Sequence, residues 1–148
     1  MYTVNDALTE PWLPLMRELV HTSHVFSQYS DRQVKRLGLT PPQFDVLVTL
    51  GNTAGMSFKE LGEKTLLTKG SLTGIVDRMA EKGWVKRVNS TDDRRSTRVC
   101  LTAKGARLFE KVFPEHLQHL ASAFRCISKQ DRKDLEKLLR TLRNVLQK

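Results

Sequence analysis

The sequence predicts a mainly α-helical chain that carries one small β-hairpin, an α+β class in which helices dominate. Apolar residues recur at helical spacing over most of the 148 residues. Serine and threonine repeatedly stand just before these runs, where they can cap a helix. The stretch 84–101 departs from this pattern, because two β-prone runs there flank a polar turn.

Composition and charge indicate one soluble domain with a polyanionic partner. Hydrophobic residues make up 39% of the chain and charged residues 28%, ordinary values for a folded protein. The net charge of +9 favours binding to phosphates. No secretory signal or membrane-spanning stretch is recognisable, so we expect a cytoplasmic protein without membrane contact. The two cysteines, Cys100 and Cys126, form no CxxC pattern, and no cofactor is indicated.

The first expected helix covers residues 11–37, where leucine, phenylalanine and valine recur at helical spacing. Gly38 follows and is placed to end it. Thr40 and Gln43 then form a capping box with prolines between them, which predicts a second helix. The region of Gly51 is expected to end that helix.

The next segment has the pattern of two short helices joined by a tight turn. A capping box from Ser57 to Glu60 predicts a helix through Lys64. Thr68 can cap a further helix that ends at Gly83, with apolar residues at i, i+3, i+4 and i+7. A short helix, a tight turn and a second helix form a helix-turn-helix.

A hairpin with a charged tip follows directly. Its β-prone runs, 84–88 and 97–101, flank the polar segment 89–96. A helix fits the major groove of B-form DNA, and an arginine-bearing hairpin beside it can reach the adjacent minor groove. Small, hydrogen-bonding residues after Thr68 would let the helix backbone approach phosphates. These segments together predict a head that binds double-stranded DNA.

Two further helices are expected in the C-terminal part of the chain. Thr102 caps the first of them, and Pro114 must kink this helix or interrupt its hydrogen bonding. Ser128 opens the second helix, in which leucine and valine continue at helical spacing to residue 146.

Several stretches resemble the MarR family of transcriptional regulators, and the resemblance covers essentially the whole chain. The matching stretches are LGE at 61–63, IVDRMAEKGWV at 75–85, DRR at 93–95 and VCLTAKG at 99–105. The family's pattern in the last region reads Asp-x-Arg, a short strand, then Leu-Thr-x-x-Gly. The resemblance implies one domain over 1–148, with a winged helix-turn-helix at 40–101 and helical dimerisation parts at 8–37 and 102–148.

The resemblance also assigns roles to residues of the head. Arg95 would enter the minor groove from the wing tip, and Asp93 would bond to Arg95 and fix its direction. Phosphates would be held by Arg87, Arg94 and Arg98. Base edges or flanking phosphates would be met by Thr68, Lys69, Ser71, Thr73 and Arg78. A solvated surface charge for each cation, and a turn-forming role for Asp93, remain as alternatives.

One departure from the family concerns the second helix of the helix-turn-helix. Gly74 stands where some relatives have a base-reading arginine. We therefore expect weaker direct readout of bases from this helix.

At the level of function, the resemblance implies a homodimer that binds a pseudopalindromic operator as a repressor. Two-fold symmetry would place the reading helices about 34 Å apart. A phenolic or other lipophilic anion is expected as effector, in a crevice near Trp12, His21, Tyr29 and Phe44. Trp12, Tyr29 and Phe44 each have ordinary core packing as an alternative.

Two other classes of function compete with DNA-linked regulation. His21 and His24, like His116 and His119, stand at i, i+3 and could together hold a metal ion, either in a metal-responsive regulator or in a small metalloenzyme. No nucleophile-base pair or glycine-rich phosphate loop is visible, so we expect no enzyme. A winged helix that binds proteins and ignores DNA is the remaining alternative.

Overall fold

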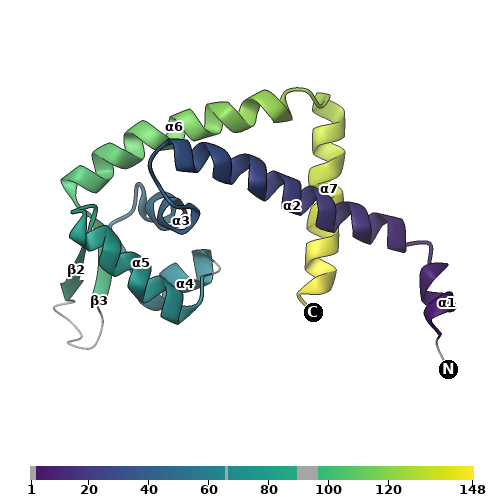
Figure 1. The fold of residues 1–148 in the computed structure, drawn as a ribbon, viewed down its shortest axis with the longest axis horizontal. Helices are drawn as coiled ribbons and strands as arrows, with labels where there is room; N and C mark the ends of the chain where they lie inside the picture. The colour runs from purple at the N-terminus through teal and green to yellow at the C-terminus, as the bar shows by residue number, and fades with distance from the viewer. Residues whose placement is uncertain (1–2, 66, 90–96) are drawn as a thin grey trace.

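The computed structural model describes residues 3–65, 67–89 and 97–148. Within these ranges the chain forms helices and one small antiparallel sheet (Figure 1), which confirms the expected class. The elements in chain order are α1 Val4–Leu8, α2 Leu13–Arg36, α3 Pro41–Leu50, β1 Met56–Ser57, α4 Phe58–Thr65, α5 Lys69–Glu81, β2 Val85–Asn89, β3 Thr97–Leu101, α6 Ala103–Phe124 and α7 Lys129–Leu146.

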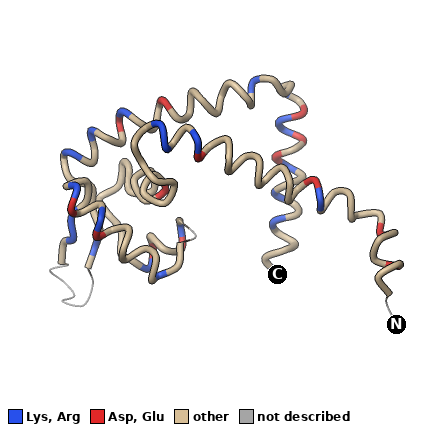
Figure 2. The backbone as a smooth tube through the Cα atoms, viewed as in Figure 1, with Lys and Arg blue, Asp and Glu red and all other residues tan. Residues whose placement is uncertain are grey.

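The molecule divides into a head and extended arms. The head gathers α3, α4, α5 and the sheet, while α2 and α6 lead away from it and α7 turns back from the end of α6 (Figure 1). The N-terminus lies at the end of the molecule far from the head, and the C-terminus, at the end of α7, lies between that end and the head (Figure 1). Lysine and arginine recur around the head, on α5, on the wing strands and on the first turns of α6 (Figure 2). None of the described helices combines the length and apolar character needed to cross a membrane.

The hydrophobic core lies in the head and where the arms join it. Side chains from α3, α4, α5 and β3 meet there, and Val34 of α2 and Val112 of α6 attach the arms. The arms themselves are poorly covered, because α1 and α7 contain no buried residue. The fully buried side chains are Val34, Val46, Leu47, Leu50, Leu61, Leu72, Val76, Met79, Val99 and Val112.

The sheet has one more strand than the sequence predicted. The hairpin strands β2 and β3 pair from Val85↔Leu101 to Asn89↔Thr97, and β1 adds to the far side of β3 in the order β1-β3-β2. The pairs are Met56↔Val99 and Ser57↔Arg98. A strand of two residues is too short to show an alternating pattern, so sequence periodicity could not reveal it.

The predicted caps are present. Thr40 accepts a hydrogen bond from the Gln43 backbone and the Gln43 side chain accepts one from the Thr40 backbone, while Thr68, Thr102 and Ser128 each cap the following helix. Gly38 ends α2 with a φ of +82°, a conformation that glycine adopts without a steric penalty.

One expectation about the arms needs correction, whereas Pro114 lies inside a helix as expected. The first helix begins at Leu13, and a separate helix α1 precedes it, with a reciprocal capping box between Thr3 and Asp6 that went unnoticed in the sequence. The Thr3 hydrogen bonds lower the pKa of the Asp6 carboxyl. Pro114 does not end α6, which continues through it to Phe124. Its missing N–H removes one helical hydrogen bond.

Candidate nucleic-acid interface

The two helices of the helix-turn-helix are fixed at their starts by side-chain caps. The Ser57 backbone N–H donates to Glu60 Oε2 at 2.8 Å and the Glu60 N–H donates to Ser57 Oγ at 3.2 Å. These bonds lower the pKa of the exposed Glu60 carboxyl, with Ser57 as the main cause. At α5, Thr68 Oγ1 accepts from the Ser71 N–H at 3.3 Å and donates to Ser71 Oγ at 3.0 Å. Thr68 is therefore occupied as a cap, whatever else it contacts.

One face of α5 packs on the core and the other is open to solvent. Leu72, Ile75, Val76 and Met79 are buried. The side chains expected to contact DNA, Lys69, Ser71, Thr73 and Arg78, are exposed on the other part of the helix surface. Thr73 Oγ1 donates to the Lys69 carbonyl at 3.1 Å. The exposed face thus offers short polar groups and two cations at one end of the head.

Arg87 joins three elements of the head. Its guanidinium donates to Asp77 Oδ1 of α5 at 2.5 Å and lies over the ring of Phe58 in α4, 5.4 Å from the ring centroid. Asp77 was not singled out in the sequence, since the two residues stand ten positions apart on different elements. This guanidinium braces the wing strand against both helices.

Arg98 is also engaged within the head. Its Nη2 donates to the Gly55 carbonyl at 2.5 Å, and the neighbouring Cys100 Sγ donates to the Ala54 carbonyl at 3.4 Å. Both bonds tie the segment before β1 to β3. The three wing residues Asp93, Arg94 and Arg95 lie outside the described residues.

The comparisons with known proteins identify the family. The model of the MarR family matches residues 39–97. The organic hydroperoxide resistance transcriptional regulator of Bacillus subtilis, strain 168, is 30% identical over 139 residues, which cover 91% of each chain. This chain belongs to the MarR family. It is a DNA-binding transcriptional regulator with a winged helix-turn-helix.

Solved MarR-family structures share this fold. Sco3205 from Streptomyces coelicolor, solved in complex with DNA, has a TM-score of 0.81 at 23% identity and covers 99% of this chain and 90% of its own. NadR, solved in complex with 4-hydroxyphenylacetate, has a TM-score of 0.70 at 22% identity and covers 84% of this chain and 88% of its own. At these identities the likeness concerns the fold alone.

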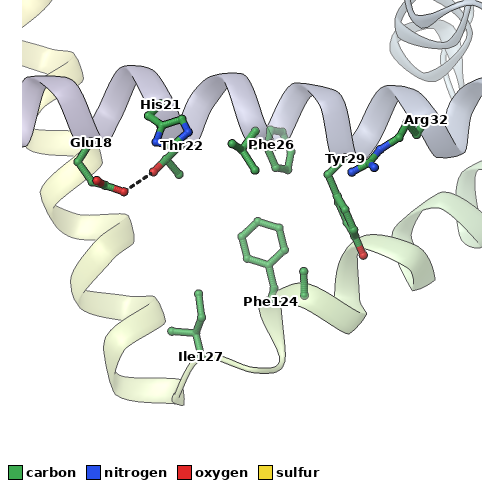
Figure 3. A pocket seen from close by; sticks show the side chains of 10 residues that line it. Glu18, His21, Thr22, Phe26, Tyr29, Arg32, Phe124 and Ile127 are labelled. Carbon is green, nitrogen blue, oxygen red and sulfur yellow. Dashed lines mark hydrogen bonds between the residues drawn. The ribbon is translucent and has the colours of Figure 1, made fainter.

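A second candidate site of this MarR-family protein is an apolar cleft between α2 and the end of α6. It measures about 440 Å³ and is edged by polar groups (Figure 3). Phe26 and Phe124 face each other across it with ring centroids 6.2 Å apart. The lining residues are Glu18, His21, Thr22, Val25, Phe26, Tyr29, Arg32, Ala123, Phe124 and Ile127.

The structure brings together two of the four residues expected at an effector crevice. His21 and Tyr29 line the cleft. Trp12 does not line it and is 53% exposed, whereas Phe44 packs edge-on against His116 with ring centroids 4.6 Å apart. The sequence analysis did not assign Phe26 and Phe124 to a ligand site, because both recur at the helical spacing of ordinary packing residues.

His116 sits in a buried polar network between the two arms. Its Nδ1 is 2.7 Å from Gln33 Oε1 and its Nε2 is 3.2 Å from Ser30 Oγ, both on α2. Burial lowers the pKa of His116, and the charge of His119 lowers it further. His119 stacks on Tyr29 at 4.3 Å between centroids, and its buried Nε2 has no hydrogen-bond partner among the described residues.

The histidine pairs do not assemble into the metal site that their spacing in the sequence suggested. His24 pairs with Gln28 on its own helix, with 3.0 Å between the two Nε2 atoms, while His116 is committed to Gln33 and Ser30. Among residues 3–65, 67–89 and 97–148, no group of three or more His, Cys, Asp or Glu side chains could hold a metal ion.

Proposed function

We propose that this MarR-family regulator acts as a homodimeric repressor on a pseudopalindromic operator and releases it in response to a small lipophilic anion. The observation that carries the proposal is the pairing of an open, basic reading head with arms whose apolar side chains lack cover. The head accounts for DNA binding, and the arms account for the dimer.

The dimer is inferred from exposed apolar surface on the arms. α7 has no buried residue, yet leucine and valine recur along it at helical spacing. Apolar exposure on this scale marks a surface that another chain covers. The large exposed side chains of the arms are Val4, Leu8, Trp12, Leu15, Met16, Val20, Val25, Phe26, Leu117, Phe124, Leu135, Leu138, Leu139, Val145 and Leu146.

A two-fold dimer determines the form of the operator. Each head would place α5 in a major groove, with Lys69, Ser71 and Thr73 facing the DNA, and the wing beside it in a minor groove. The two reading helices would then meet half-sites about one helical turn, roughly 34 Å, apart. The proposed wing contacts, Asp93, Arg94 and Arg95, rest on the family resemblance alone. Arg87 and Arg98 could meet phosphates only in addition to the bonds they already make.

The effector is inferred from the cleft between α2 and α6. Its aromatic walls fit a ring, and Arg32 and His21 at its edge are placed to meet an anionic group. NadR, a protein of the same fold, was solved with 4-hydroxyphenylacetate, which combines these two features. The separation of the two heads would differ between the DNA-free and the DNA-bound dimer. An effector would relieve repression if it bound the DNA-free conformation more tightly than the DNA-bound one.

The DNA interface is tested with the first residue of α5. Lys69→Ala should weaken binding to a duplex from upstream of the protein's own gene, because it removes one phosphate contact. The slope of log affinity against log salt should become shallower by about one unit. Fluorescence anisotropy across a salt series measures both quantities.

The matched control for Lys69 is Lys111→Ala, an equal loss of charge at an exposed position of α6. It should leave the salt slope unchanged. An affinity and a slope for Lys69→Ala equal to those of the parent protein would remove the start of α5 from the interface.

A further inference from the structure

The exposed face of α5 contains glycine where a side chain would be expected to reach the DNA. At 100° per residue, Gly70 and Gly74 lie opposite the buried stripe of Leu72, Ile75, Val76 and Met79. A β carbon added at Gly70 would meet nothing within 4 Å. The residues in the middle of this face therefore contribute no side chain to its surface.

Arg78 covers the gap at Gly74. A β carbon at Gly74 would lie 3.6 Å from Arg78 Nη1, so this guanidinium rests over the glycine one turn before its own Cα. Side chains on a helix lean toward its N-terminus, which explains why residue 78 covers the surface at residue 74. The guanidinium occupies the space that a longer side chain at residue 74 would fill.

Arg78 also differs from Arg87 and Arg98, because its side chain has no partner among the described residues. Arg87 is paired with Asp77, and Arg98 donates to the Gly55 carbonyl. The Arg78 side chain makes no hydrogen bond or ion pair with any residue in the described part of the chain. Its donors are therefore available to a ligand without displacement of any carboxylate of the described residues.

We propose that Arg78 is the base-reading side chain of α5, and that Gly74 gives it this role by leaving space beneath the guanidinium. The base would be a guanine, because the arginine fork donates to O6 and N7 together in the major groove. The proposal rests on the proposed entry of α5 into the major groove. It replaces the expectation that Gly74 weakens readout from this helix.

The experiment is a selection from a pool of DNA duplexes with a randomised core spanning two half-sites, carried out in parallel with the parent protein and Arg78→Ala. The parent should select a motif with one strongly preferred guanine in each half-site. Arg78→Ala should select the same motif without that preference. Its affinity for the parent's motif should fall about 5- to 150-fold, the effect of losing one bidentate base contact.

Two further variants separate base reading from simple charge and test the role of glycine. Gly74→Leu places a bulky group where the guanidinium rests, at a partly exposed helical position, and should lose the guanine preference without a fall in melting temperature. Arg107→Ala removes an exposed arginine from α6 and should retain the full motif.

The outcomes distinguish this inference from the function on which it rests. If Arg78→Ala binds all sequences more weakly but selects the parent's motif, Arg78 contacts phosphate and the inference is overturned. If Gly74→Leu keeps the guanine preference, the glycine has no part in readout and that half of the inference fails. A parent protein that enriches no motif would overturn both the inference and the proposed operator binding.

Discussion

At the scale of single residues, His116 shows how the arms are joined near the head. It is 4% exposed, and both ring nitrogens have partners on α2, so the neutral ring fits its site without a buried charge. The groups around it are Gln33 and Ser30 on α2, Phe44 on α3 and His119 on α6. A positive charge on His119 would repel a positive charge on His116. Protonation of His116 therefore destabilises the contact between α2 and α6.

The sign of the resulting pH dependence follows from the lowered pKa. The folded protein holds His116 neutral at pH values where the unfolded chain, with a pKa near the ordinary 6.5, already binds a proton. Stability from this group is therefore complete above the ordinary pKa of 6.5, and it is lost as the pH falls from that value through the lowered pKa of the folded state. We expect the free energy of unfolding of His116→Asn, measured by urea denaturation, to decline less over this range than that of the parent.

His24→Asn serves as the control for His116, because His24 is exposed on α2. It should leave the pH dependence unchanged. Equal pH dependence in His116→Asn and the parent would show that another group responds to acid.

The roles of individual arginines lay beyond sequence analysis. The DRR run and the basic hairpin predict contacts with a polyanion, but sequence gives each arginine the same chemistry. Arg87 and Arg98 are distinguished from Arg78 by partners ten and 43 positions away. Such distant contacts depend on the assembled head, and no local pattern encodes them.

At the scale of elements, the wing is joined rigidly to α6. A β carbon at Gly105 would lie 1.9 Å from the Trp84 carbonyl oxygen, and this contact involves backbone that cannot rotate away. Thr102 strengthens the junction, since its Oγ1 donates to the Gly83 carbonyl at 2.5 Å and its N–H donates to the Trp84 carbonyl at 3.1 Å. The start of β2 and the first turn of α6 therefore move together.

Gly105→Ala should disturb this junction. We expect a loss of about 1–3 kcal/mol in the free energy of unfolding, although alanine is the better helix former. The matched control is Gly70→Ala, also in a helix, where the added methyl meets nothing. Chemical denaturation should show the control equal to the parent or more stable by up to about 1 kcal/mol. If the two variants proved equally stable, the close approach at Gly105 would be unimportant.

Elements were predictable where a local signal marks their start. The capping residues Thr40, Ser57, Thr68, Thr102 and Ser128 placed the corresponding helices well. The strand β1 was missed because it exists only through pairing with β3, 43 positions along the chain at Met56↔Val99. The cleft at Phe26 and Phe124 was missed for the same reason, as its walls come from α2 and α6.

At the scale of the whole molecule, one end carries the head proposed to bind DNA, and the other end presents apolar surface. The head is built around the hydrophobic core, to which α2 and α6 also contribute, whereas α1 and α7 bury no residue within the described chain. A helix such as α7, with a strongly apolar stripe and no cover, gains stability mainly by packing against another surface. The proposed partner is a second copy, whose two-fold symmetry would present two heads to one duplex.

The most direct measurement of this account is the stoichiometry of the protein on DNA, determined by sedimentation velocity with a labelled duplex containing the selected motif. We expect a dimer in free solution and two protomers on each duplex. Leu138→Glu on α7 should weaken both the association of the protomers and DNA binding. A monomer that binds the duplex singly, with the affinity of the parent retained in Leu138→Glu, would contradict this expectation.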